Sequence, residues 1–141
     1  ALAERYLRQN LESQRESRSK ALIETYNTLG LALRRQGKWR EAIQEYEKAL
    51  AIAPGNASLL YNLAMACKEG KDFDAAAEAL DRALASSAAF GEGNEVICSN
   101  MGLIYSKAGQ RQKAVVQVKR TLKINPGHTK ARALLARLHK G

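Results

Sequence analysis

The feature that most constrains the fold of this sequence is a unit of about 34 residues that recurs along the chain. Inside each unit the apolar residues keep the spacing of one helix face. A shift of 34 residues aligns two such faces in the sequence. Leu60, Leu63, Ala64 and Cys67 then correspond to Tyr26, Leu29, Gly30 and Leu33. A further shift of 38 residues reaches Cys98, Met101, Gly102 and Tyr105. Three copies of one unit predict a supersecondary structure stacked on itself.

Each copy has the pattern of two helices joined by a tight turn. In the first copy, residues 36–38 (Gln-Gly-Lys) separate two helical patterns, and residues 54–56 (Pro-Gly-Asn) end the unit. Proline cannot continue a helix, and Gly tolerates positive φ. The second helices also correspond, with Trp39, Ala42, Tyr46 and Ala49 repeated as Phe73, Ala76, Leu80 and Ala83, and then as Ala114, Val118 and Thr121. Small residues on these core faces predict that neighbouring helices approach closely.

This pattern resembles the tetratricopeptide repeat, whose signature is an aromatic residue, Leu-Gly and Tyr in a first helix, and Ala and Phe in a second, closed by Pro. The resemblance covers residues 23–128 and implies an all-α, right-handed α-solenoid of stacked antiparallel helix pairs. The third copy departs most, because Cys98, Arg111 and Thr121 replace two aromatic residues and an Ala.

We predict three repeats, at residues 23–56, 57–94 and 95–128. The four extra residues of the longer step predict a longer loop between Ser86 and Asn94. Residues 129–141 carry apolar residues at helical spacing and predict a C-terminal capping helix. In residues 1–22 we expect a helix from about residue 2 to 16, with or without continuation into the first repeat. This segment is interpreted as an N-terminal cap, a linker helix or the second helix of an earlier unit.

No motif for catalysis, a cofactor or a metal is found in the sequence. A Gly-rich phosphate loop and a nucleophile motif are both missing. His128 and His139 are too far apart in sequence to form a local pair of metal ligands. Cys67 and Cys98 occupy core positions and are interpreted as buried hydrophobic residues. We therefore expect a protein that is not an enzyme and binds neither metal nor cofactor.

The family resemblance implies a concave groove, lined by the first helices, that takes an extended peptide or a partner helix. The candidates are the first-helix residues outside the core pattern: Asn27, Leu31, Arg34, Arg35, Tyr61, Asn62, Met65, Lys68, Ser99, Asn100, Leu103 and Ser106. Asn62 and Asn100 are equivalent, and an Asn amide can both donate to and accept from a peptide backbone. The alternative is that these amides bond to the neighbouring repeat. Leu31, Met65 and Leu103 predict an apolar strip beside them.

One subgroup of the family grips the carboxylate tail of heat-shock chaperones with a set of Lys, Asn and Arg side chains. The corresponding positions here are Asn27, Leu31, Asn62, Val96 and Asn100. Only Asn62 matches the set, so chaperone-tail recognition of this kind is not expected.

The net charge of +9 lies entirely in the last third of the chain, because residues 96–141 hold ten Lys and Arg residues and no acidic one. We expect six of them to project from a basic convex or end surface: Lys113, Arg120, Lys123, Lys130, Arg137 and Lys140. Such a surface is either simply solvated or meets an acidic protein, nucleic acid or an anionic membrane. Nucleic acid is disfavoured because no aromatic platform for bases accompanies the charges.

The sequence thus predicts a protein-protein interaction module, and the resemblance implies that it belongs to a larger signalling or assembly protein. The alternatives are binding of an acidic partner or polyanion by the basic surface, and self-association into a homo-oligomer through the terminal helices. No apolar run approaches the length of a membrane span. Two cysteines without a disulfide framework favour a reducing, cytoplasmic location.

Overall fold

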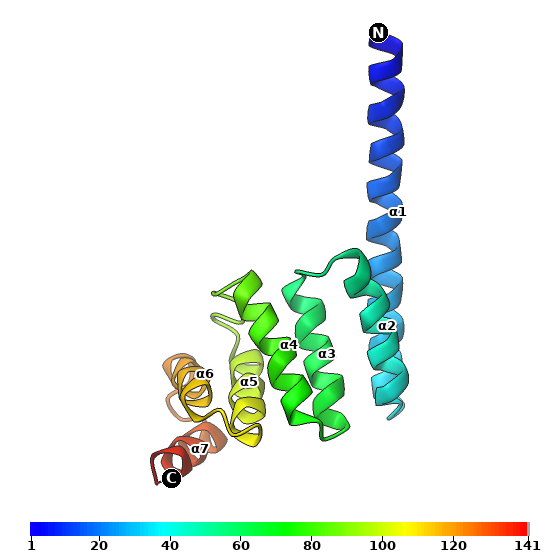
Figure 1. The fold of residues 1–141 in the computed structure, drawn as a ribbon. Helices are drawn as coiled ribbons and strands as arrows, with labels where there is room; N and C mark the ends of the chain where they lie inside the picture. The colour runs from blue at the N-terminus through cyan, green and yellow to red at the C-terminus, as the bar shows by residue number, and fades with distance from the viewer. Residues whose placement is uncertain (141) are drawn as a thin grey trace.

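The computed structural model describes residues 1–140, which form seven α-helices and no strand (Figure 1). In chain order the helices are α1 (Leu2–Arg35), α2 (Trp39–Ile52), α3 (Ala57–Glu69), α4 (Phe73–Ser86), α5 (Glu95–Lys107), α6 (Arg111–Ile124) and α7 (Thr129–Lys140). Helices pack in the pairs α1 with α2, α3 with α4 and α5 with α6, each pair stacks on the next, and α7 packs on the last pair. The expected all-α solenoid is confirmed.

The turn inside each pair uses a left-handed residue at the same place in the repeat. Gly37, Lys71 and Gly109 have φ of 78°, 61° and 76°. They are separated by the same two steps that relate the repeats. Glycine adopts this conformation without steric strain, whereas a residue with a Cβ is strained there. Lys71 therefore holds a position whose backbone suits glycine better.

The small residues of the repeat lie where helices touch. A Cβ added to Gly30 of α1 would lie 2.5 Å from Cε1 of Tyr46 on α2. Gly70, after α3, has the same relation to the ring of Trp39. Ala42 and Ala49 are fully buried. Close approach of neighbouring helices at these positions is confirmed.

Helix α1 follows the alternative in which the N-terminal helix continues into the first repeat, because it runs without a break from Leu2 to Arg35. Residues 12–22 contain neither Pro nor Gly, so nothing in the chain stops the helix before the first repeat. Its first half extends well beyond α2 (Figure 1) and leaves Leu2, Tyr6 and Leu11 more than half exposed.

The expected core face of the first repeat is only partly covered. Leu63 and Met101 have exposed fractions of 8% and 0%, whereas Leu29, their equivalent in α1, is 43% exposed. Helix α2 packs against α3, and α4 against α5, which covers the later copies. No helix within residues 1–140 lies in the corresponding place against α1. Residues that are equivalent in the repeat are therefore buried to different extents.

Candidate functional site

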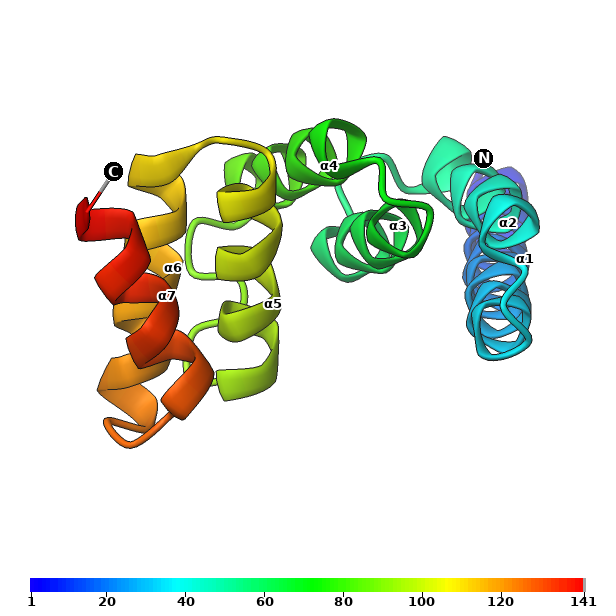
Figure 2. The same cartoon turned by 90° about the horizontal axis from the view of Figure 1, so that it is seen from below.

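The helices α1, α3 and α5 lie along the inner side of the arc seen in Figure 2. The twelve residues expected to line a groove are on these helices, and we call them together the inner face. Eleven of the twelve are partly buried, and only Arg35 is exposed. Partial burial means that these side chains are held by neighbours while retaining surface for a partner.

The asparagines of the inner face bond to side chains of neighbouring first helices. Asn62 Nδ2 donates to Asn27 Oδ1 at 2.8 Å, which joins α3 to α1. Asn100 Nδ2 donates to the Tyr61 hydroxyl at 2.8 Å, which joins α5 to α3. These bonds agree with the alternative prediction, in which the Asn amides bond to the neighbouring repeat. Within residues 1–140 the Oδ1 atoms of Asn62 and Asn100 have no hydrogen-bond partner, so each amide keeps one acceptor for a ligand.

Two cations of the inner face have different surroundings. Arg34 Nε and Nη2 donate to Oε1 of Glu69 at 2.9 and 2.7 Å, so this guanidinium is neutralised by the next repeat. Lys68 forms no ion pair within residues 1–140. Burial lowers the pKa of the Lys68 ammonium, against the opposing effect of Glu69. An anionic group near Lys68 would stabilise the charged ammonium and offset part of the cost of its burial.

The expected apolar strip consists of partly buried side chains on three helices. Leu31 and Met65 are partly buried, and Met65 packs against the core. At its side, the ring of Tyr61 meets the ring of Phe90 with centroids 5.8 Å apart. Phe90 belongs to the longer loop between α4 and α5, so that loop adds an aromatic contact to the inner face.

A cavity of about 220 Å³ lies where α5, α6 and α7 meet. We call it the end pocket. Its lining combines inner-face residues with residues of the last two helices: Ser99, Leu103, Val118, Thr121, Lys130, Ala131, Ala133, Leu134 and Arg137. The Thr121 hydroxyl donates to the backbone oxygen of Gln117 at 3.0 Å. That hydroxyl therefore needs no partner inside the pocket.

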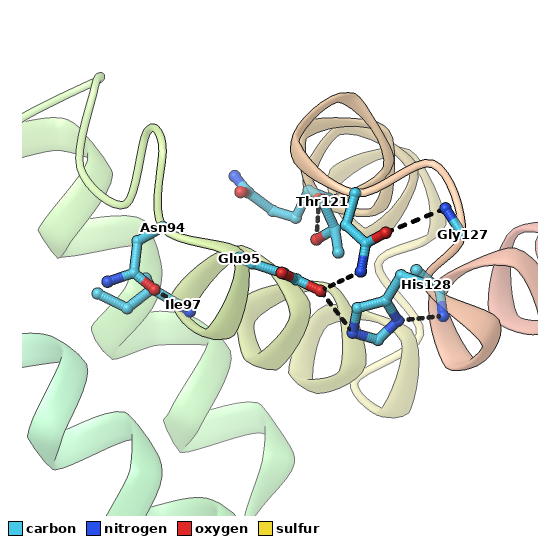
Figure 3. A network of polar contacts seen from close by, with 9 residues as sticks. Asn94, Glu95, Ile97, Thr121, Gly127 and His128 are labelled. Carbon is cyan, nitrogen blue, oxygen red and sulfur yellow. Dashed lines mark hydrogen bonds and ion pairs between the residues drawn. The ribbon is translucent and has the colours of Figure 1, made fainter.

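A polar network fixes the start of α7 against α5 (Figure 3). Glu95 Oε1 accepts a hydrogen bond from Asn125 Nδ2 at 2.8 Å and lies 3.7 Å from His128 Nε2. His128 Nδ1 accepts from the backbone N–H of Ala131 at 3.1 Å, which caps α7. The end pocket is thus bordered by helices whose ends are tied together.

The capping role of His128 was not predicted from the sequence, where this residue was considered only as a metal ligand. The signal was present, because the steps of 38 and 34 residues place His128 on Asn56 and Asn94. Both asparagines are N-caps whose side chains accept a hydrogen bond from the backbone three residues later. A residue aligned with two N-caps is itself a candidate cap.

One of the six residues expected on the basic surface, Arg120, does not project outward, which corrects the prediction for that residue. Lys113 remains exposed, with its Nζ 3.0 Å from Asp81 Oδ1. Arg120 turns inward and donates to the backbone oxygen of Phe90 at 3.0 Å. The cause is the longer loop, which presents the backbone oxygen of Phe90 to the guanidinium.

Two more of the six basic residues are exposed on the last helix, at the end surface that the prediction allowed. Lys130 and Arg137 line the end pocket together with Ser99 and Leu103 of the inner face. Lys123 and Lys140 are exposed as expected. Helix α7 therefore brings part of the positive charge to the end of the inner face, which sequence spacing alone does not show.

Residues 1–140 contain no group of three or more His, Cys, Asp or Glu side chains that could hold a metal ion. Cys67 and Cys98 are buried, free thiols, as expected. Across the same residues, none of the helices combines the length and the apolar character needed to cross a membrane.

Comparison with known proteins agrees with the repeat pattern. Two family models described as tetratricopeptide repeat match, one over residues 1–55 and the other over residues 33–90. The chain belongs to the tetratricopeptide repeat family. Proteins of this fold generally act as non-catalytic protein-binding modules. No curated protein sequence matches the chain.

Solved structures share the fold of this tetratricopeptide repeat protein. The crystal structure of MamA is 26% identical, with a TM-score of 0.70 over 84% of this chain and 67% of that one. The second repeat domain of human RPAP3, solved with an HSP70 peptide, is 20% identical, with a TM-score of 0.71 over 87% and 99% of the two chains. The first repeat domain of Spaghetti (RPAP3), bound to an HSP90 peptide, is 24% identical, with a TM-score of 0.70 over 84% and 90%.

Proposed function

We propose that this chain is a non-catalytic interaction module that binds a peptide or helix of a protein partner along the inner face. The binding unit consists of the repeats at residues 23–56, 57–94 and 95–128, with residues 129–141 closing its end. The module belongs to a larger signalling or assembly protein in the cytoplasm. The buried free thiols of Cys67 and Cys98 support a reducing location.

One observation carries this proposal. The inner face combines amide acceptors on Asn62 and Asn100 with partly buried apolar side chains, and it ends in a cavity large enough for a side chain. Backbone-reading polar groups beside apolar pockets are what recognition of an extended peptide requires. The family membership and the peptide-bound structures of similar fold support the same reading.

The chaperone tails bound by the RPAP3 domains are not proposed as ligands here. Four of the five positions of the carboxylate-binding set differ in this chain. The matching residue, Asn62, donates to Asn27. The shared fold therefore does not bring the shared ligand with it.

The test is a selection of twelve-residue peptides from a random display library, followed by mapping of amide chemical shifts on the chain. We expect the amide chemical shifts of Tyr61, Met65 and Leu103 to change and those of the outer helices α2, α4 and α6 to stay the same. The double variant N62A/N100A should weaken the selected peptides several-fold, and E78A at the exposed Glu78 of α4 serves as a control. Binders that map to α2, α4 and α6, or an affinity unchanged in N62A/N100A, would show that the proposed face or its amides are wrong.

A second candidate function is self-association through α1, which one observation favours. Leu22 and Leu29 are 46% and 43% exposed, and a shallow apolar hollow follows the same flank from Ala21 to Ala32. A second copy could cover this flank as α2 covers α3. Sedimentation equilibrium decides it: L22E/L29E should abolish the dimer, and a wild-type monomer at millimolar concentration removes the idea.

A further inference from the structure

The end pocket has the size and the lining of a site for one apolar side chain. Its volume of about 220 Å³ exceeds the roughly 150 Å³ that suffice to hold a benzene ring. Leu103, Val118 and Leu134 come from three different helices and give it apolar walls. Because the Thr121 hydroxyl bonds within α6, an apolar guest leaves no donor of that residue unpaired.

Two cations line the same pocket. Lys130 and Arg137 are seven residues apart on α7, which places them on one side of the helix about 10 Å apart along its axis. The ion pairs of residues 1–140 use Arg34, Lys48 and Lys113, and Glu95 lies near His128, so none of these contacts uses Lys130 or Arg137. No acidic residue follows Glu95 in the chain. The charge beside this cavity is therefore not compensated from within.

The pocket is also held in shape before any ligand arrives. The contacts of Glu95 with Asn125 and His128, and the cap on Ala131, fix α7 relative to α5. A preorganised site loses less conformational entropy on binding than a flexible one. This arrangement suits a pocket that binds one kind of partner side chain and does not reshape itself for different ones.

We propose that the end pocket takes a bulky apolar side chain from an acidic segment of the partner, with flanking carboxylates paired to Lys130 and Arg137. In an extended segment, side chains at alternate positions share one face, so carboxylates two positions before and two positions after the apolar residue lie on its side, about 13 Å apart. The long side chains of Lys130 and Arg137 can reach this spacing from positions about 10 Å apart along α7. The inference rests on the proposed binding along the inner face and names the chemistry at one end of it. The occupant is an acidic peptide of another protein.

The experiment uses three synthetic nine-residue peptides titrated into the whole chain, with amide chemical shifts as the readout. The first has a central Phe with one Glu two positions before it and one Glu two positions after it, the second has Lys in place of both Glu, and the third has Ala in place of Phe. We expect the first peptide to shift Ser99, Leu103, Ala131 and Leu134. The second and third should bind at least about fivefold more weakly, because each loses one of the two contacts.

Exposed cations inside and outside the pocket lining allow two variants to be compared. K130E/R137E should weaken the first peptide about tenfold, as expected for reversal of two rim charges. K119E, which reverses an exposed charge on α6 outside the pocket lining, should leave the affinity within about twofold. Circular dichroism verifies that both variants fold.

Several results would overturn the inference. No shift at the four pocket residues at millimolar peptide, equal binding of the acidic and basic peptides, or equal loss in K119E would each do so. Concentration-dependent shifts of the same residues without peptide would identify a second copy as the occupant instead. Library peptides that perturb Tyr61 and Met65 but never the end pocket would leave the proposed function standing while this inference falls.

Discussion

At the scale of single residues, the stacking of helices depends on a position that carries no side chain. The Tyr46 ring packs directly on the backbone of Gly30. A Cβ on residue 30 would lie only 2.5 Å from Cε1 of Tyr46, which is too close for two carbon atoms. The ring itself is fully buried. Gly30 is thus required by its neighbour on α2 and not by its own backbone, since it lies inside a helix.

The change Gly30→Leu should therefore lower the free energy of unfolding by about 1 to 3 kcal/mol, the usual cost of overpacking. Urea denaturation monitored by circular dichroism measures it. The control is Ala21→Leu, which adds the same side chain on an exposed part of α1 and should change stability by less than about 0.5 kcal/mol. Equal urea midpoints for the two variants would contradict the assigned contact.

The two cysteines are a second case in which burial decides chemistry. Burial raises the pKa of the Cys67 thiol from 9.0 to about 11, with smaller contributions from Asp72 and Glu47. Burial also raises the pKa of Cys98, against an opposing contribution from Arg120. The thiolate is the reactive form, so both groups should be inert in the folded chain.

Alkylation of native Cys67 by iodoacetamide should be slow at pH 8 and should accelerate up to about pH 11 without a plateau at 9. Because the folded pKa is the higher one, the stability linked to this thiol is present below pH 9 and is lost as pH rises towards 11. Mass spectrometry of quenched samples gives the rate. A plateau near pH 9 would mean that Cys67 reacts from a solvated state.

At the scale of helices, caps and turns set where each element begins. Asn56, Asp72 and Asn94 cap α3, α4 and α5 through side-chain oxygens. His128 does the same for α7 through a ring nitrogen, while its other nitrogen faces Glu95. One residue therefore both starts the last helix and orients it.

Replacement of His128 separates these two roles. His128→Asn keeps an N-cap acceptor but removes the nitrogen that faces Glu95, whereas His128→Ala removes both. We expect His128→Ala to destabilise α7 by about 1 kcal/mol and His128→Asn by less. Hydrogen exchange of the α7 amides measures this locally. Equal protection in both variants and the wild type would exclude a role for the cap.

At the scale of the whole molecule, the position of a repeat in the stack decides what its residues do. Leu29, Leu63 and Met101 are equivalent in sequence, yet only Leu29 is exposed. A solenoid buries each unit against its neighbours, so the first unit keeps one open flank.

The same substitution should consequently have different costs along the chain. Leu63→Gln should lower the free energy of unfolding by about 2 to 4 kcal/mol, since it buries an unpaired amide in the core. Leu29→Gln should change it by less than about 1 kcal/mol. Thermal melts of both variants at low protein concentration test this. A large loss in Leu29→Gln would indicate that the flank is covered in solution.

The sequence by itself determined the repeat, because stacking requires small and apolar residues at fixed spacing, and that spacing is visible without a structure. It therefore predicted the helix pairs, the close contacts at Gly30 and Ala42, and the helices that hold the inner face. What only the tertiary structure decided was the relation between units. The bond of Asn62 to Asn27, the inward turn of Arg120 and the meeting of Lys130 with Leu103 each join residues at least 27 positions apart. Helical periodicity fixes a side chain's direction within its own helix, whereas its neighbour depends on how the pairs pack.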